Sequence, residues 1–243
     1  VSSFGKMFDY VFFCTKSKDT EPLMYELGKF VHVKTIITTL QNGFYNYRIL
    51  KKFFGKSKCL QGICKIGVEV DSKSVIRHTS LGFILIGESS DKKTKRLTAL
   101  ESLLKSSGIK VKIPEDFQKE IWIKFAWNSI FNTLTGIFPV TVDKLFSNYE
   151  YNKLVSDLYN EIKKVAKSYK VTFDANAFKR IITDTKSLGT FKTSAYQDRL
   201  KNKEIETPYF TSELIRMAKA KKINIPVITY LHYLSKAVSL FNK

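Results

Sequence analysis

Two apolar runs close to the N-terminus restrict this chain to a small set of folds. The run from Asp9 to Thr15, D-Y-V-F-F-C-T, is almost continuously apolar, which is typical of a strand buried on both faces of a parallel sheet. A helix-like stretch over 21–30 follows, with Pro22 in its first turn, and a second apolar run covers 35–40. This order predicts a right-handed parallel βαβ unit, whose ligand crevice lies at the carboxyl ends of the strands.

The rest of the chain divides into a mixed part and a helical part. Strand-like runs at 62–70, 74–78 and 83–86, with a polar turn at 71–73, predict antiparallel pairing. A helix over 93–105 should end before Gly108, acting as a C′ glycine, and a short strand at 109–113 precedes Pro114. Beyond Pro114, apolar residues recur every three or four positions, which predicts helices alone. We expect them at about 115–133, 150–168, 174–187, 208–222 and 227–241, and we expect an α/β domain at 1–113 and a helical domain at 114–243.

Composition excludes several classes of protein. A hydrophobic content of 44%, with 5 Pro and 11 Gly in 243 residues, is typical of a packed globular chain. No apolar run reaches the length of a membrane span, and the first residues do not follow a signal-peptide pattern. The three cysteines lack CxxC spacing and the three histidines lack ligand spacing, so we expect no disulfide framework and no metal site. We therefore expect a cytoplasmic protein without membrane contacts.

The net charge permits two interpretations. The chain has 41 Lys and Arg against 22 Asp and Glu, a formal charge of +19, which taken alone favours a polyanionic partner. However, only six of the basic residues are arginine, and the lysines are spread along almost every segment. Because no nucleic-acid-binding motif accompanies the charge, we expect no nucleic-acid partner. A small anionic ligand fits equally well, and a non-catalytic basic binding protein remains the alternative.

One predicted helix carries a narrow polar stripe. In the segment 121–132, I-W-I-K-F-A-W-N-S-I-F-N, Lys124, Asn128 and Asn132 lie at i, i+4 and i+8 on a helix that is otherwise apolar. A buried ammonium and two buried amides are costly unless they find partners, so the stripe predicts a polar cavity or a ligand. The alternative is a lysine that reaches solvent beside two hydrogen-bonded core amides.

A second polar segment, T-S-A-Y-Q-D at 193–198, is followed by Glu206, Thr207 and Pro208. Thr207 and Pro208 suit the N-cap and N1 positions of a helix, which places Glu206 just before a helix start. The structural alternative for Glu206 is a favourable interaction with the helix dipole. Ser194 has no nucleophile-elbow sequence around it, so a serine hydrolase is not expected.

Together these segments resemble the 2-dehydropantoate 2-reductases, also called ketopantoate reductases. The resemblance rests on the order and spacing of D-Y-V-F-F-C-T-K, L-Q-N-G, G-I-C-K-I-G-V-E-V-D-S-K-S-V-I-R-H, W-I-K-F-A-W-N-S-I-F-N-T-L-T-G and T-S-A-Y-Q-D. It implies an incomplete Rossmann-like NADP-binding domain followed by a helical C-terminal domain of the 6-phosphogluconate dehydrogenase type. The family's glycine-rich first βα turn has no counterpart in the sequence, and we expect it upstream of Val1.

The resemblance also implies a reaction. The family reduces 2-dehydropantoate, a small anionic 2-keto acid, to pantoate with NADPH, in pantothenate and coenzyme A biosynthesis. Lys124 matches the family's catalytic lysine, which donates a proton to the developing alkoxide. Asn128 and Asn132 match residues that hydrogen-bond the substrate, and Ser194 matches one that contacts its carboxylate.

Three further residues match the family's site. Glu206 matches a catalytic acid that also lies on the cofactor side, and its spacing, nine residues after Gln197, favours it over Glu204. Lys16 matches a cofactor-binding position, and Asn42 matches one that contacts cofactor and substrate.

The sequence also departs from the family pattern. Asn46 stands where a second glycine is frequent, Ala195 replaces a frequent methionine, and Thr207-Pro208 replaces Ile-Asp. Another 2-keto acid is therefore the alternative substrate, and a homodimer is left open.

Overall fold

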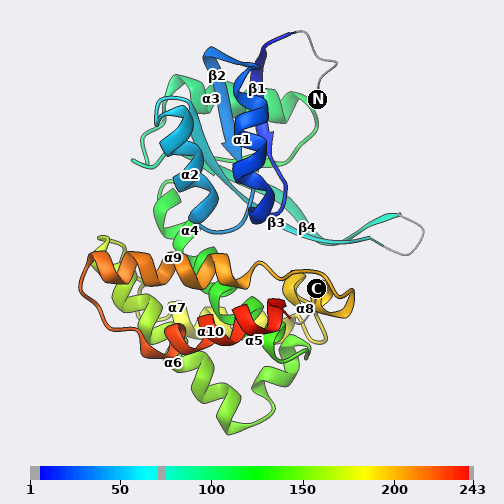
Figure 1. The fold of residues 1–243 in the computed structure, drawn as a ribbon, viewed down its shortest axis with the longest axis vertical. Coiled ribbons are helices and arrows are strands. Elements are labelled where there is room, and N and C mark those ends of the chain that lie inside the picture. Colours follow the sequence, from blue (N-terminus) through cyan, green and yellow to red (C-terminus); the bar gives the residue numbers. More distant parts are fainter. Residues whose placement is uncertain (1–5, 71–74, 241–243) are drawn as a thin grey trace. The chain divides into compact units, whose positions relative to one another are not determined.

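The computed structural model describes residues 6–70 and 75–240. The chain forms two compact units, Val1–Ile121 and Trp122–Lys243 (Figure 1). The first combines a sheet with helices and the second is helical.

Unit 1 is built on a five-stranded sheet. Its strands β1 (Phe8–Phe13), β2 (Val31–Thr39), β3 (Cys59–Val70), β4 (Ile76–Gly87) and β5 (Val111–Lys112) lie side by side in chain order. The pairs β1–β2, β2–β3 and β4–β5 are parallel and β3–β4 is antiparallel. The predicted βαβ unit and the antiparallel pairing are thereby confirmed, while the turn at 71–73 lies outside the described residues.

From the two runs predicted as separate strands at 74–78 and 83–86, residues 76–78 and 83–86 belong to the single strand β4. The reason is that shifts in register along β3, between Lys65 and Ile66 and between Gly67 and Val68, let the pairing continue through Leu81. The prediction of two strands was therefore wrong at this point.

Helices cover both faces of the sheet. On one face, α1 (Thr20–Gly28) and α2 (Tyr45–Phe54) pack against alternate residues of β1, Val11 and Phe13. On the other face, α3 (Lys95–Ser106) packs in a core cluster that Tyr10 of β1 joins. This alternation explains why the β1 run is apolar at consecutive positions.

The sequence predicts the glycine that ends α3, but it does not predict helix α2. Gly108 has a φ of 76° and follows α3, so it is the C′ glycine that the sequence predicts. Helix α2 was not predicted, although its buried residues recur with helical spacing and Gly55 ends it at a φ of 88°. Its ten residues are short for recognition by periodicity alone.

Unit 2 surrounds one interrupted helix. Helix α4 (Phe117–Trp127) begins in unit 1 and continues as the π-helical turn η2 (Asn128–Asn132) and as α5 (Thr133–Ile137). Packed in the same unit are the 3₁₀ helix η3 (Val142–Phe146), α6 (Tyr149–Ser168), α7 (Ala177–Ser187), α8 (Ser194–Leu200), α9 (Thr207–Ala220) and α10 (Pro226–Leu240). Within 122–240 no strand occurs, as predicted. Among the described helices, none is both long and apolar enough to cross a membrane.

Candidate active site

In unit 1, the candidate cofactor residues lie at one edge of the sheet. Because β1 and β2 are parallel neighbours, the segments that follow them leave from the same edge. Lys16, half-buried, follows β1 and precedes the short 3₁₀ helix η1 (Ser17–Asp19). Asn42, also half-buried, follows β2 and precedes Gly43, whose φ is 79°. Both predicted residues therefore occupy the edge where open α/β sheets bind ligands.

A buried hydrogen-bond network ties these two segments together. The side-chain amide of Gln41 donates to the carbonyl of Thr15 and to the Thr20 hydroxyl, both at 2.8 Å. The Thr20 hydroxyl donates to Asn46 Oδ1 at 2.9 Å, and Asn46 Nδ2 donates to Ser17 Oγ at 3.0 Å. Asn46, where the family frequently has a glycine, is completely buried. Its hydrogen bonds link the segment after β1 to the segment after β2. No local pattern reveals this, because the contacts join residues 21 to 29 positions apart.

In unit 2, the polar stripe coincides with the π-helical turn. Lys124 lies in the last turn of α4, and both Asn128 and Asn132 belong to η2. The side-chain amide of Asn132 donates to Asn128 Oδ1 at 2.9 Å, which aligns the two carboxamides. The sequence predicts a continuous α-helix here, and the π-helical turn corrects that expectation. Such turns are frequent at functional sites.

The same turn binds the N-terminus of α8. Asn132 Oδ1 accepts hydrogen bonds from Ser194 Oγ at 3.2 Å and from the Ala195 amide at 3.1 Å. Thr193 caps α8, and its hydroxyl lies 2.7 Å from that of Thr135. The structure thus brings together Asn128, Asn132 and Ser194. Helix α8 was not predicted, although Thr193 is a typical N-cap residue.

The amide nitrogen of Asn128 is a candidate donor toward a ligand. Asn128 is 1% exposed, and its Nδ2 has no hydrogen-bond partner within residues 6–70 and 75–240. An unsatisfied buried donor costs free energy, so a group that accepts from it would be bound favourably.

Lys124 and Glu206 adjoin this cluster on neighbouring segments. Lys124 is half-buried, and its Nζ lies 5.1 Å from the centroid of the Trp127 ring. Glu206 is half-buried and is the N-cap of α9, a helix that packs against η2. The expected N-cap, Thr207, is instead the first helical residue, because the Glu206 carbonyl already accepts from the Tyr209 amide. Glu204 is also half-buried.

Gly136 allows the segments that carry Ser194 and Glu206 to approach α5. A Cβ at Gly136 would lie 3.2 Å from the Ala195 Cβ, 3.3 Å from Ile205 Cδ1 and 3.5 Å from Thr207 Cγ2. The first two distances are shorter than ordinary van der Waals contact. The sequence shows this glycine only as part of T-L-T-G, and its packing role becomes visible in three dimensions.

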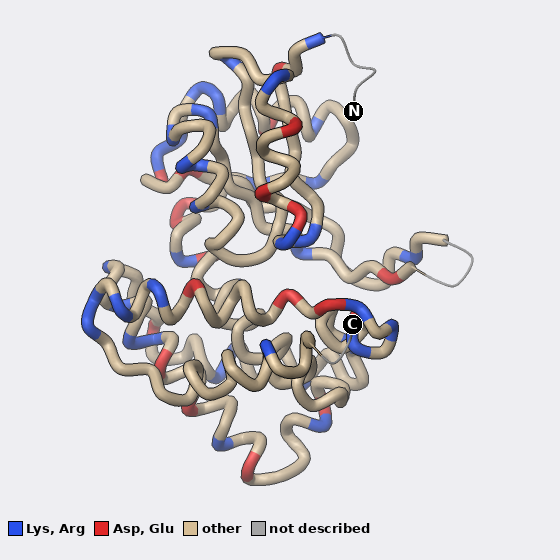
Figure 2. The backbone as a smooth tube through the Cα atoms, viewed as in Figure 1, with Lys and Arg blue, Asp and Glu red and all other residues tan. Residues whose placement is uncertain are grey.

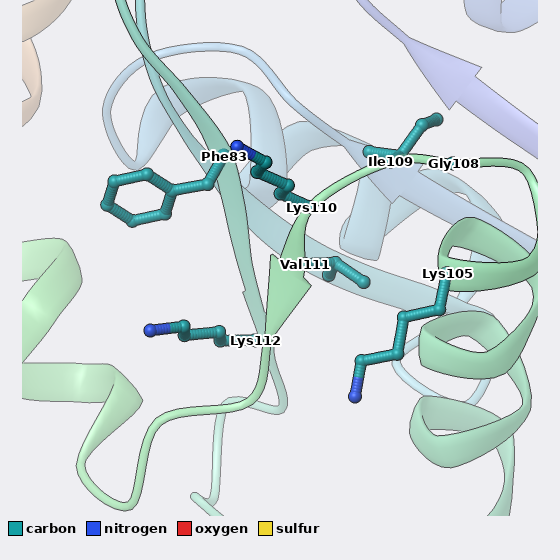
Figure 3. A pocket seen from close by; sticks show the side chains of 7 residues that line it. All are labelled: Phe83, Lys105, Gly108, Ile109, Lys110, Val111 and Lys112. Carbon is teal, nitrogen blue, oxygen red and sulfur yellow. The ribbon is translucent and has the colours of Figure 1, made fainter.

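Basic side chains, carboxylates and a surface hollow elsewhere in the described residues can be compared with this candidate site. Lys and Arg are distributed along most elements of both units (Figure 2). In the described part of the chain, no group of three or more His, Cys, Asp or Glu could hold a metal. A hollow beside β5 is shown in Figure 3, and none of the predicted site residues lines it. Its lining residues are Phe83, Lys105, Gly108, Ile109, Lys110, Val111 and Lys112.

Comparison with known proteins places these features in a family. The 2-dehydropantoate 2-reductase of Aquifex aeolicus (strain VF5) is 26% identical over 242 residues, which cover 96% of this chain and 77% of that protein. The crystal structure of the 2-dehydropantoate 2-reductase from Geobacter metallireducens GS-15 superimposes with a TM-score of 0.88 at 21% identity, over 96% of this chain and 78% of that one. A D-mandelate dehydrogenase, solved with NADH and anilino(oxo)acetate, superimposes with a TM-score of 0.85 at 20% identity. The match covers 98% of this chain and 78% of that one.

The fold is accordingly a Rossmann-like domain followed by a helical domain, as in the ketopantoate reductases. The family model for ketopantoate reductase PanE/ApbA matches residues 2–91, and that for the C-terminal part of the same family matches residues 116–239. The chain therefore belongs to the ketopantoate reductase PanE/ApbA family of oxidoreductases.

Proposed function

We propose that the protein reduces 2-dehydropantoate to pantoate with NADPH, as a step in pantothenate and coenzyme A biosynthesis. The observation that carries the proposal is the hydrogen-bonded cluster of the buried Asn128 and Asn132 with the exposed Ser194, one helical turn from Lys124. A carboxamide with a free donor, a hydroxyl and an ammonium are suited to bind a small anionic 2-keto acid.

The residues at the sheet edge fit a nicotinamide dinucleotide. Lys16 supplies a positive charge and Asn42 an amide at the ends of adjacent parallel strands, and such edges bind dinucleotides in open α/β sheets. We assign both to the cofactor, Asn42 also to the substrate, and Glu206 to both catalysis and the cofactor. When bound, the reduced nicotinamide supplies the hydride.

Lys124 serves as the proton donor. As hydride reaches the keto carbon, the carbonyl π bond breaks, negative charge develops on the oxygen and the Lys124 ammonium transfers its proton there. Solvent then returns a proton to the amine. An ammonium also stabilises the developing charge, and proton transfer by a positioned group contributes about 10²- to 10⁴-fold. Asn128 Nδ2 donates to the substrate, Ser194 contacts its carboxylate, and Glu206 helps to place substrate and lysine.

Another 2-keto acid is the second candidate substrate. The D-mandelate dehydrogenase of similar fold was solved with NADH and anilino(oxo)acetate, an oxo carboxylate that carries an aromatic ring. In this chain, Thr207 and Pro208 follow Glu206 in place of the family's Ile-Asp, and this departure next to the acid favours a different substrate.

The test is turnover with a panel of 2-keto acids. The protein is expressed from the whole open reading frame that contains this chain, and consumption of NADPH and of NADH is followed with 2-dehydropantoate, pyruvate and phenylglyoxylate. Preference for 2-dehydropantoate with NADPH supports the proposal, and preference for another acid supports the second candidate. Absence of nucleotide binding, with salt-sensitive binding to a polyanion, would favour the non-catalytic alternative.

A further inference from the structure

The side chain of Trp127 lies beneath the amine of Lys124. The two residues are three positions apart on α4, and Lys124 Nζ lies 5.1 Å from the centroid of the indole ring. Ammonium groups within about 6 Å of an aromatic face are attracted to it, most strongly when the ring is tryptophan. The position of the amine is therefore coupled to the position of this ring.

The ring itself is fixed from α7. The indole Nε1–H donates to Thr185 Oγ1 at 3.0 Å. Thr185 is completely buried, and its own hydroxyl donates to the Ile181 carbonyl at 2.6 Å, so its oxygen is free to accept from the indole. A rotation of the indole would leave this buried hydroxyl without its donor.

Two aromatic contacts add to the hydrogen bond. The Trp127 ring packs on Phe131 of η2, with 5.3 Å between ring centroids, and on Phe191, with 6.5 Å between them. Contacts from three segments therefore fix both the tilt and the position of the ring, whereas the four-carbon stem of a lysine is flexible.

We propose that Trp127 is a positioning residue that holds the Lys124 amine in place, and that Thr185 acts through Trp127. This inference rests on the proposed role of Lys124 as proton donor. A displacement of about 1 Å in a reacting group can cost as much as 10²-fold in rate. The lysine donates its proton in the transition state, so a looser amine should reduce kcat more than it raises KM.

The kinetic test uses a pair of matched variants at Thr185. Thr185→Val keeps the shape but loses the hydroxyl, and we expect kcat to fall by about 10-fold with KM within about two-fold. Thr185→Ser keeps the hydroxyl and should restore most of kcat. Trp127→Phe keeps a packed ring without the N–H and should resemble Thr185→Val. Equal and near-normal kcat in Thr185→Val and Trp127→Phe would overturn the proposal.

A spectroscopic test separates this inference from the proposed function. This chain has two tryptophans, and the variants Trp127→Phe and Trp122→Phe identify the indole N–H signal of each in the NMR spectrum. Lys124→Met should shift the Trp127 signal and leave the Trp122 signal unchanged. An unchanged Trp127 signal would overturn the proposed contact, even in an active enzyme. A shifted signal in a protein that turns over no 2-keto acid would support the contact and refute the reductase assignment.

Discussion

Replacing Asn132 by alanine removes the acceptor that joins the π-helical turn to α8. Three hydrogen bonds are lost: the one to Asn128 Oδ1 at 2.9 Å and those from Ser194 Oγ at 3.2 Å and the Ala195 amide at 3.1 Å. Each contributes about 1 kcal/mol net, and the buried Ala195 amide left without a partner costs about 1–3 kcal/mol more. We therefore expect the free energy of unfolding of unit 2 to fall by about 4–6 kcal/mol.

Urea unfolding followed by tryptophan fluorescence measures this loss, because Trp122 and Trp127 are the two tryptophans and both belong to unit 2. Ser194→Ala removes one of the three hydrogen bonds and should cost about 1 kcal/mol. Since the two residues share a bond, the double variant should be less destabilised than the sum of the single variants, by about 0.5–1.5 kcal/mol. A loss below about 1 kcal/mol for Asn132→Ala, or strict additivity, would refute this account of the cluster.

Three further perturbations test other contacts. The Glu161 carboxylate accepts hydrogen bonds from the Val227 and Ile228 amides at the start of α10, at 3.0 and 2.9 Å. Glu161→Ala should therefore lower the urea midpoint of unit 2 by an amount corresponding to about 1–3 kcal/mol. An unchanged midpoint would contradict this role. Burial raises the pKa of Glu88, but hydrogen bonds from Arg96 and Thr94 outweigh it and leave the pKa below its ordinary value of 4.5. The stabilising contribution of Glu88 is therefore complete above pH 4.5 and is lost as the pH falls through the lower folded-state pKa. Urea unfolding followed by circular dichroism should show that the free energy of unfolding falls less steeply with acid in Arg96→Gln than in the unmodified protein. Asn46→Ala should accelerate hydrogen exchange in residues 15–20, and unchanged protection would exclude a linking role for Asn46.

Much of the architecture could be predicted from local pattern. The alternation of Val11 and Phe13 with Tyr10 gives β1 two covered faces, which appears in sequence as an apolar run. The helical spacing after Pro114 predicted a second unit without strands, and Gly108 predicted a helix end. Each of these features depends on residues close together in the chain.

The details of the candidate site depend on contacts between distant residues. Asn128 and Asn132 are four positions apart in the sequence whether the turn is α-helical or π-helical. Their spacing therefore does not predict which of the two helix types forms. Asn46 links loops through partners 26 and 29 positions away, and Gly136 matters because Ala195 and Ile205 approach it. Sequence pattern contains no direct signal of such approaches.

The most direct test of the account is the rate of NADPH oxidation with saturating 2-dehydropantoate in the enzyme and in Lys124→Ala. Loss of the proton donor should lower kcat by about 10²-fold or more, with the urea midpoint of unit 2 changed little. A Lys124→Ala protein that oxidises NADPH at the rate of the unmodified enzyme would contradict the central claim, because the proton would then come from another group.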